Sequence, residues 1–193
     1  MADKIVLFDY GGVLGYDHLI EKEELLAYTL GLTQAELNNR ISEKSTIGKA
    51  FRENKVTEIE FWRSVSQNDK INEKFARELT SMWMDTYCLN ETMMEFLQLL
   101  RKVAKVGVLT NIDIGRSELL EKILDSNTNL DYYFPSYVFG FSKDTPQLWE
   151  LVNEKLFQQN HNLDIIYIDD RAEHVLSAES IGWKGVRYYN FVQ

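Results

Sequence analysis

Three apolar runs, each closed by polar residues, constrain the fold of this chain more than any other feature of its sequence. Short apolar runs that end in polar or glycine residues are typical of buried parallel strands whose carboxyl ends open into loops. The runs and the polar residues that follow them are Ile5 to Phe8 with Asp9, Val106 to Leu109 with Thr110-Asn111, and Ile165 to Ile168 with Asp169-Asp170.

Helical patterns fill the gaps between these runs. Asn90 can cap a helix whose buried side would carry apolar residues up to Leu100, including Met93, Met94, Phe96 and Leu97. The alternation of strands and helices predicts a parallel sheet with helices on both faces, a Rossmann-like, doubly wound α/β fold. Further strands are predicted at Tyr137 to Phe139 and Gly185 to Tyr189, and further helices near residues 116–124, 145–156 and 172–180.

The interval from about residue 17 to residue 89 breaks this alternation. It contains no convincing strand, and capping-box patterns at Thr33 and Thr57 each mark the start of a helix. Gly48 is predicted to lie in a bend between two helices, and Trp62 and Trp83 to lie in a helical core. We therefore expect two units, a sheet-containing core of residues 1–16 and 90–193 and an inserted helical unit of residues 17–89.

The charge balance excludes some partners. Thirty acidic and 21 basic residues give a formal charge of −9, so neither a nucleic acid nor an anionic membrane would find a neutralising surface. The single cysteine, Cys88, cannot form an internal disulfide, which fits a reducing compartment. With no signal-peptide pattern and no apolar stretch near the roughly 20 residues of a membrane span, we expect a cytoplasmic protein. The oligomeric state is not indicated.

The polar residues after the three runs point to a metal. In a doubly wound sheet the carboxyl ends of the strands meet at one edge, where ligands bind. Asp9, Asp169 and Asp170 would then lie together and repel one another unless a cation sits between them. Oxygen ligands suit a hard divalent cation, Mg²⁺ above all.

Four segments, in this order and spacing, resemble the motifs of the haloacid dehalogenase-like hydrolase superfamily, and the chain looks like one of its phosphatase-type members. They are FDYGGVLGYD at the first strand, VGVLTN at the second, FGFSKDTPQLWELV, and IIYIDDRAEHVLSAESIGWKGVRYY. The helical insert, which includes IGKAFRENKVTEIEFW, looks like the all-helical cap of that family.

The resemblance implies a magnesium-dependent hydrolase that removes phosphate from a small phosphorylated metabolite through an aspartyl-phosphate on Asp9. Thr110 would hold the phosphoryl group and Lys143 would offset the negative charge. Asp169 would orient metal-bound water. The implied Mg²⁺ ligands are Asp9, the carbonyl of Gly11 and Asp170, and the implied substrate contacts are Thr110, Asn111, Lys143, Gly11 and Gly12.

Two positions depart from the family pattern. Phosphatase members usually carry a second aspartate two residues after the nucleophile, where this chain has Gly11, so we expect slow turnover or an activated leaving group. Asp113 either replaces that acid or, as we favour, caps the next helix. Asp144 stands where the family usually has proline and would place a carboxylate beside Lys143.

Two histidines lie near the motifs. We expect His18 at the surface and assign His174 no catalytic role. Two other functions stay open. A haloacid dehalogenase would use the same aspartate without a metal, although the Gly11-Gly12 pair leaves no side chain to shape a halide pocket. A catalytically weak binding or regulatory protein is favoured by Gly11 and Asp144.

Overall fold

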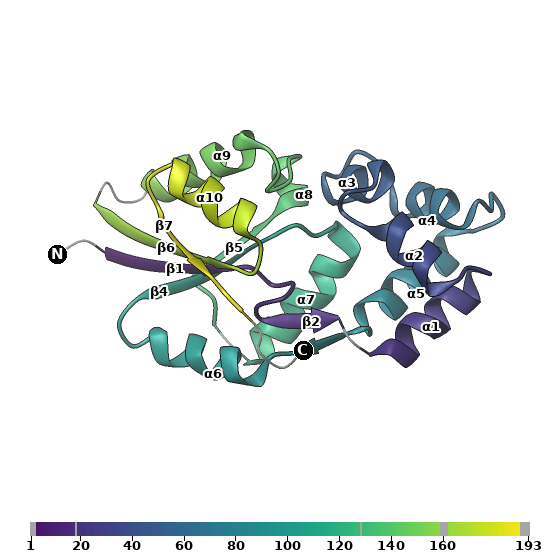
Figure 1. Ribbon diagram of the computed structural model, residues 1–193, viewed down its shortest axis with the longest axis horizontal. Coiled ribbons are helices and arrows are strands. Elements are labelled where there is room, and N and C mark those ends of the chain that lie inside the picture. Colours follow the sequence, from purple (N-terminus) through teal and green to yellow (C-terminus); the bar gives the residue numbers. More distant parts are fainter. Residues whose placement is uncertain (1–2, 18, 128, 159–161, 190–193) are drawn as a thin grey trace.

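The structure, a computed structural model, describes residues 3–17, 19–127, 129–158 and 162–189, so His18 lies outside the described residues. A parallel sheet has helices on both faces, and a group of helices stands beyond one end of it (Figure 1). The strand order is β5-β4-β1-β6-β7, which confirms the α/β, Rossmann-like prediction. The strands are β1 (Asp3–Phe8), β4 (Lys105–Thr110), β5 (Tyr132–Pro135), β6 (Leu163–Asp169) and β7 (Lys184–Arg187).

The central strand β1 shows why its sequence is an unbroken apolar run. Ile5 and Leu7 pack on one face of the sheet against α9 and α10, while Val6 and Phe8 pack on the other face against α6 and α7. Because both faces are covered, every residue of the run is buried. The covering helices are α6 (Glu91–Leu100), α7 (Ile114–Asn127), α9 (Pro146–Phe157) and α10 (Ala172–Ser180).

Asn90 caps α6 as predicted, because its side chain accepts a hydrogen bond from the Met93 amide. Phe96 was expected on the buried side of α6, but it is 42% exposed. Its ring meets Phe8 edge-on, with the centroids 6.5 Å apart.

The strand predicted at Tyr137 to Phe139 is wrong. Residues Ser136–Phe139 form the short helix α8, and the strand β5 lies just before it. Pro135 has no N–H to continue a ladder. The buried hydroxyl of Ser136 accepts a hydrogen bond from the Ile112 amide at 3.0 Å and donates to the carbonyl of Arg52 at 2.7 Å. Both stretches are rich in aromatic residues, so the apolar pattern alone does not distinguish them.

The helices of the insert pack around a hydrophobic core of their own. Both capping boxes form, at Thr33 and Thr57, and Trp62 and Trp83 are buried in that core, as predicted. The helices are α1 (Ile20–Thr29), α2 (Gln34–Ile41), α3 (Thr46–Arg52), α4 (Glu58–Ser66) and α5 (Glu73–Met84).

Two details of the insert differ from expectation. The interval does contain a strand, since β2 (Gly15–Asp17) and β3 (Tyr87–Leu89) pair antiparallel where the chain enters and leaves the helices. Gly48 is not in a bend but inside α3. An added Cβ there would lie 2.1 Å from the carbonyl oxygen of Ser42, so the approach of the preceding turn explains the glycine. Among the described residues, no helix is long and apolar enough to cross a membrane.

Candidate active site

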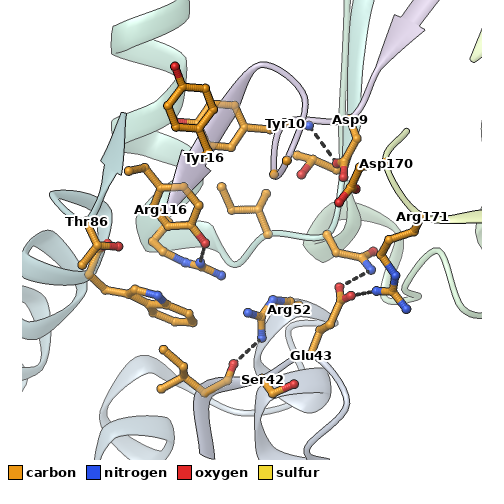
Figure 2. Close-up of a pocket in the computed structure, with 18 of the residues that line it drawn as sticks. Asp9, Tyr10, Tyr16, Ser42, Glu43, Arg52, Thr86, Arg116, Asp170 and Arg171 are labelled. Carbon is orange, nitrogen blue, oxygen red and sulfur yellow. Dashed lines mark hydrogen bonds and ion pairs between the residues drawn. The ribbon is translucent and has the colours of Figure 1, made fainter. Parts of the chain in front are cut away.

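A cavity of about 710 Å³ lies between the carboxyl edge of the sheet and the helices of the insert. Figure 2 shows Asp9 and Asp170 on one side of this cavity. Asp9 follows β1, Thr110 ends β4, and Asp170 follows β6, so parallel pairing brings these side chains to one edge. The predicted site residues that line the cavity are Asp9, Gly11, Gly12, Thr110, Asn111, Lys143 and Asp170.

Asp169 is the one predicted site residue that does not line the cavity; it is fully buried beneath it. Its Oδ2 accepts hydrogen bonds from Lys143 Nζ at 2.9 Å and from the Tyr167 hydroxyl, and lies 3.1 Å from His174 Nδ1. Its Oδ1 accepts from the amide of Arg171 at 2.8 Å. Both oxygens are therefore already engaged by protein groups.

Lys143 is the central cation of the site and is only 2% exposed. Its Nζ lies 2.8 Å from Asp9 Oδ1 and 2.9 Å from Asp169 Oδ2. Burial alone would lower the pKa of Lys143, but the charges of Asp169 and Asp9 outweigh burial and raise it. The ammonium group is therefore charged at neutral pH and holds the two carboxylates.

The same contacts move the pKa values of the acids in opposite directions. Burial raises the pKa of Asp9 from 3.8 to about 6, against the opposing effect of Lys143. Burial also opposes ionisation of Asp169, but Lys143 and His174 together hold its pKa below its ordinary value. Burial and then the charge of Asp169 raise the pKa of Asp170. Asp9 and Asp170, the acids that line the cavity, are thus the two whose negative charge the protein does not fully compensate.

The donor set fits a hard divalent cation. Asp9, Asp169 and Asp170 each offer a carboxylate oxygen within 4.8 Å of the others. Because the oxygens of Asp169 are engaged, Asp9 and Asp170 are the carboxylates left to face an ion. Gly12, with φ +78°, lets its backbone approach Asp170 so closely that an added Cβ would lie 2.6 Å from the Asp170 carboxyl carbon.

Asp9 also has an oxygen free for chemistry. Its Oδ1 accepts hydrogen bonds from the Tyr10 amide at 2.8 Å and from Lys143. Within the part of the chain that the structure describes, no hydrogen bond or ion pair engages Oδ2. This oxygen can therefore act as a metal ligand or a nucleophile.

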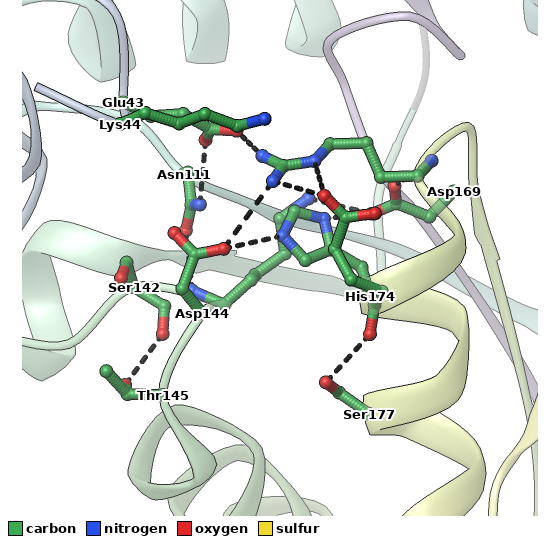
Figure 3. A network of polar contacts seen from close by, with 12 residues as sticks. Glu43, Lys44, Asn111, Ser142, Asp144, Thr145, Asp169, His174 and Ser177 are labelled. Carbon is green, nitrogen blue, oxygen red and sulfur yellow. Dashed lines mark hydrogen bonds and ion pairs between the residues drawn. The ribbon is translucent and has the colours of Figure 1, made fainter.

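A polar network crosses from the insert to the sheet edge (Figure 3). The side chain of Asn111 donates to Glu43 Oε2 at 3.0 Å and accepts from the Lys143 amide at 2.8 Å, so both its ends are engaged. Glu43 also forms an ion pair with Arg171. Glu43, between α2 and α3, thus connects the insert to two loops of the sheet edge.

Asp144, expected beside Lys143, instead faces His174 and Arg171. Its Oδ1 lies 3.4 Å from His174 Nε2 and 3.7 Å from Arg171 Nη2. The hydrogen bond with His174 is the largest cause of the lowered pKa of Asp144. His174 is buried, so its two ring nitrogens join Asp144 to Asp169.

Asp113 caps α7, as favoured from the sequence. It is fully buried, accepts a hydrogen bond from the Arg116 amide at 3.0 Å and pairs with Arg116 Nε at 2.6 Å. It does not line the cavity, so it is not placed to replace the acid missing at Gly11.

Sequence reasoning missed several polar residues of the cavity wall. For the residues of the insert no local motif marks such positions, because they depend on how the insert meets the core. Only the neighbour of Arg52 gives a partial signal of burial, because Arg52 follows Phe51 and both residues are buried in α3. The missed residues are Glu43, Arg52, Arg116 and Arg171.

Comparison with solved structures shows the same fold. A HAD family enzyme from Bacteroides thetaiotaomicron, solved with magnesium and inorganic phosphate, is 17% identical with a TM-score of 0.73, over 99% of this chain and 96% of that chain. A HAD phosphatase from Thermococcus onnurineus is 17% identical with a TM-score of 0.62, over 98% and 88% of the two chains. A 2-haloacid dehalogenase from Pseudomonas syringae pv. Tomato is 14% identical with a TM-score of 0.62, over 97% and 86%.

No curated protein matches the chain significantly. A family model for haloacid dehalogenase-like hydrolases does match, over residues 4–182. This range includes the first three motifs that carry the resemblance, residues 165–182 of the fourth, and the insert. The chain therefore belongs to the haloacid dehalogenase-like hydrolases.

Proposed function

We propose that this hydrolase is a magnesium-dependent phosphatase of a small phosphorylated metabolite, with Asp9 as its nucleophile. The observation that carries the proposal is the group of three carboxylates, Asp9, Asp169 and Asp170, within 4.8 Å of one another beside the cavity. A dehalogenase needs no cation at this place, whereas a group of acids facing a phosphate does.

The side chains of the site suit an in-line displacement at phosphorus. An Asp9 oxygen would attack phosphorus, so that an O–P bond forms while the bond to the leaving oxygen breaks. Lys143, 2.8 Å from Asp9, would offset the charge shared by the nucleophile and the phosphoryl oxygens. Thr110, at the end of β4, would donate to a phosphoryl oxygen, and the backbone of Gly11 and Gly12 would line the same pocket.

Asp9, Asp170 and the Gly11 carbonyl would hold Mg²⁺, which neutralises charge on the phosphoryl group when bound. Asp169, buried beneath the cavity with both oxygens engaged, would hold Lys143 in place rather than orient metal-bound water. Water would then hydrolyse the aspartyl-phosphate and release Asp9. The insert of residues 17–89, with its helices α1–α5, would act as a cap that excludes bulk water. A cytoplasmic location stays a prediction.

The test is a panel of phosphorylated metabolites assayed for phosphate release with Mg²⁺, with Asp9→Asn as the blank. Asp69→Asn, an exposed site in the insert, is the matched control and should keep wild-type activity. Wild-type turnover should disappear with EDTA and in Asp9→Asn. Halide release from a 2-haloacid that persists in EDTA would instead support a dehalogenase. Equal rates for wild type and Asp9→Asn on every compound would support a binding protein.

A further inference from the structure

Two buried arginines line the cavity away from the carboxylates. Arg52 ends α3 of the insert and Arg116 lies in the first turn of α7, and they are 7% and 3% exposed. Figure 2 shows both guanidinium groups facing the pocket, on the opposite side from Asp9 and Asp170.

Both guanidinium groups lie over the ring of Trp83. The Arg116 guanidinium carbon lies 3.5 Å from the centroid of the Trp83 ring, and that of Arg52 lies 5.3 Å from it. Cation–π contact stabilises a buried guanidinium but does not neutralise its charge. The two arginines thus lie against one aromatic ring and form a preorganised cationic wall.

The protein neutralises only one of these charges. Arg116 Nε pairs with Asp113 Oδ2 at 2.6 Å, yet its Nη2 is buried without a hydrogen-bond partner among the described residues. Arg52 forms no ion pair with any carboxylate that the structure describes. Burial lowers the pKa of Arg52 to about 10, so the group still carries its charge at neutral pH.

A structural role for Arg52 does not account for that charge. Its Nη1 donates to the carbonyls of Ile41 at 3.0 Å and Gly48 at 2.9 Å, which ties the end of α2 to α3. A neutral amide donor could make such bonds. A buried charge without a counter-charge is unfavourable, and this one lines a cavity large enough for a ligand.

Resting on the phosphatase function above, we propose that the substrate carries a second anionic group, a carboxylate or a second phosphate, which Arg52 and Arg116 bind at the end remote from the reacting phosphate. The unpartnered Nη2 of Arg116 and the unpaired charge of Arg52 supply the donors and the charge. Guanidinium groups match the geometry of both anions. The acidic chain thus places positive charge where a second anion would lie.

The test compares matched ligands that differ only in the remote group. Glycerol 3-phosphate with 3-phosphoglycerate tests a carboxylate, and fructose 6-phosphate with fructose 1,6-bisphosphate tests a second phosphate. Affinities are measured by calorimetry with Mg²⁺ in Asp9→Asn, which prevents turnover, and kcat/KM is measured in the wild type. In at least one pair, the protein should bind the more anionic ligand about tenfold or more tightly.

Arg52→Gln keeps an amide donor but removes the charge, and it should bring that preference close to one. Arg116→Gln is combined with Asp113→Asn, so that no buried carboxylate is left unpaired and a capping oxygen remains. Arg77→Gln, an exposed arginine of α5, is the control and should leave the preference unchanged.

Equal affinity within both pairs, or a preference that survives in Arg52→Gln, would overturn the proposal. If the phosphatase function itself is wrong, no pair is hydrolysed and Asp9→Asn does not differ from wild type in the panel. Calorimetry still measures the charge preference in that case, so the two failures are distinguishable.

Discussion

Replacing Lys143 by methionine should destabilise the protein by about 3 kcal/mol at pH 7.5. Lys143 is buried, and its Nζ lies 2.8 Å from Asp9 and 2.9 Å from Asp169. Removing one partner of a buried ion pair typically costs about 3–5 kcal/mol. The lower end applies here because Asp9, whose pKa is already about 6, can take up a proton, which leaves one carboxylate to be paired.

The loss should depend on pH. The pKa of Asp169 is held below its ordinary value of 3.8, so its ion pair stabilises the fold above about pH 4 and is lost as pH falls through the folded-state pKa. The pKa of Lys143 is raised above 10.5, so the lysine stays charged up to that pH. In the variant, ionisation of Asp9 becomes less favourable still. The difference between wild type and variant should therefore grow from pH 4.5 to pH 7.5.

Urea unfolding in EDTA at these two pH values measures the effect. Lys74→Met is the control, since Lys74 is 88% exposed and lies 3.9 Å from Glu78. That exposed pair should contribute less than about 1 kcal/mol. The reasoning fails if Lys143→Met loses under about 1 kcal/mol at pH 7.5, or if its loss is the same at both pH values.

Three further predictions concern the loop after β1 and the nucleophile. Gly11→Asp should fold, because an added Cβ meets nothing within 4 Å. Its turnover rate should rise by up to about 100-fold on alkyl phosphates and by less on aryl phosphates. Equal gains on both substrates would contradict a general-acid role. Gly12→Ala, whose Cβ would lie 2.6 Å from Asp170, should weaken Mg²⁺ binding in a calorimetric titration, unlike Gly31→Ala, which shares a positive φ but has open space. Because the folded-state pKa of Asp9 is raised to about 6, metal-free wild type should lose stability as pH rises from 4 to 7. Asp9→Asn should remove that loss in thermal melts. Melting temperatures of wild type and Asp9→Asn that change with pH in parallel would refute the assignment.

The sequence predicted the site residues that lie at the carboxyl ends of the parallel strands. An apolar run buried on both faces identifies a strand, and the residue after each run must lie at the carboxyl edge. Asp9, Thr110 and Asp170 were placed together for this reason, and all three line the cavity. Lys143 was expected from its motif, and the structure adds that it is buried between Asp9 and Asp169.

The opposite wall of the cavity was not predictable in the same way. Glu43 meets Asn111 across 68 residues of sequence. No periodicity links a residue between α2 and α3 to the end of β4, because their contact depends on how the helices dock on the sheet. Arg52 and Arg116 likewise come from different elements, and both lie over the ring of Trp83.

The two walls together bear on the leaving group. Gly11 has no side chain to protonate the departing oxygen, and both ring nitrogens of His174 face carboxylates. Arg52, with a pKa of about 10, and Arg116, whose pKa is raised, keep their protons at neutral pH. Among the described residues, the cavity thus supplies positive charge more readily than a proton. We therefore expect the wild-type rate to fall steeply as the leaving group becomes more basic, which favours acyl phosphates or sugar 1-phosphates over simple alkyl phosphates.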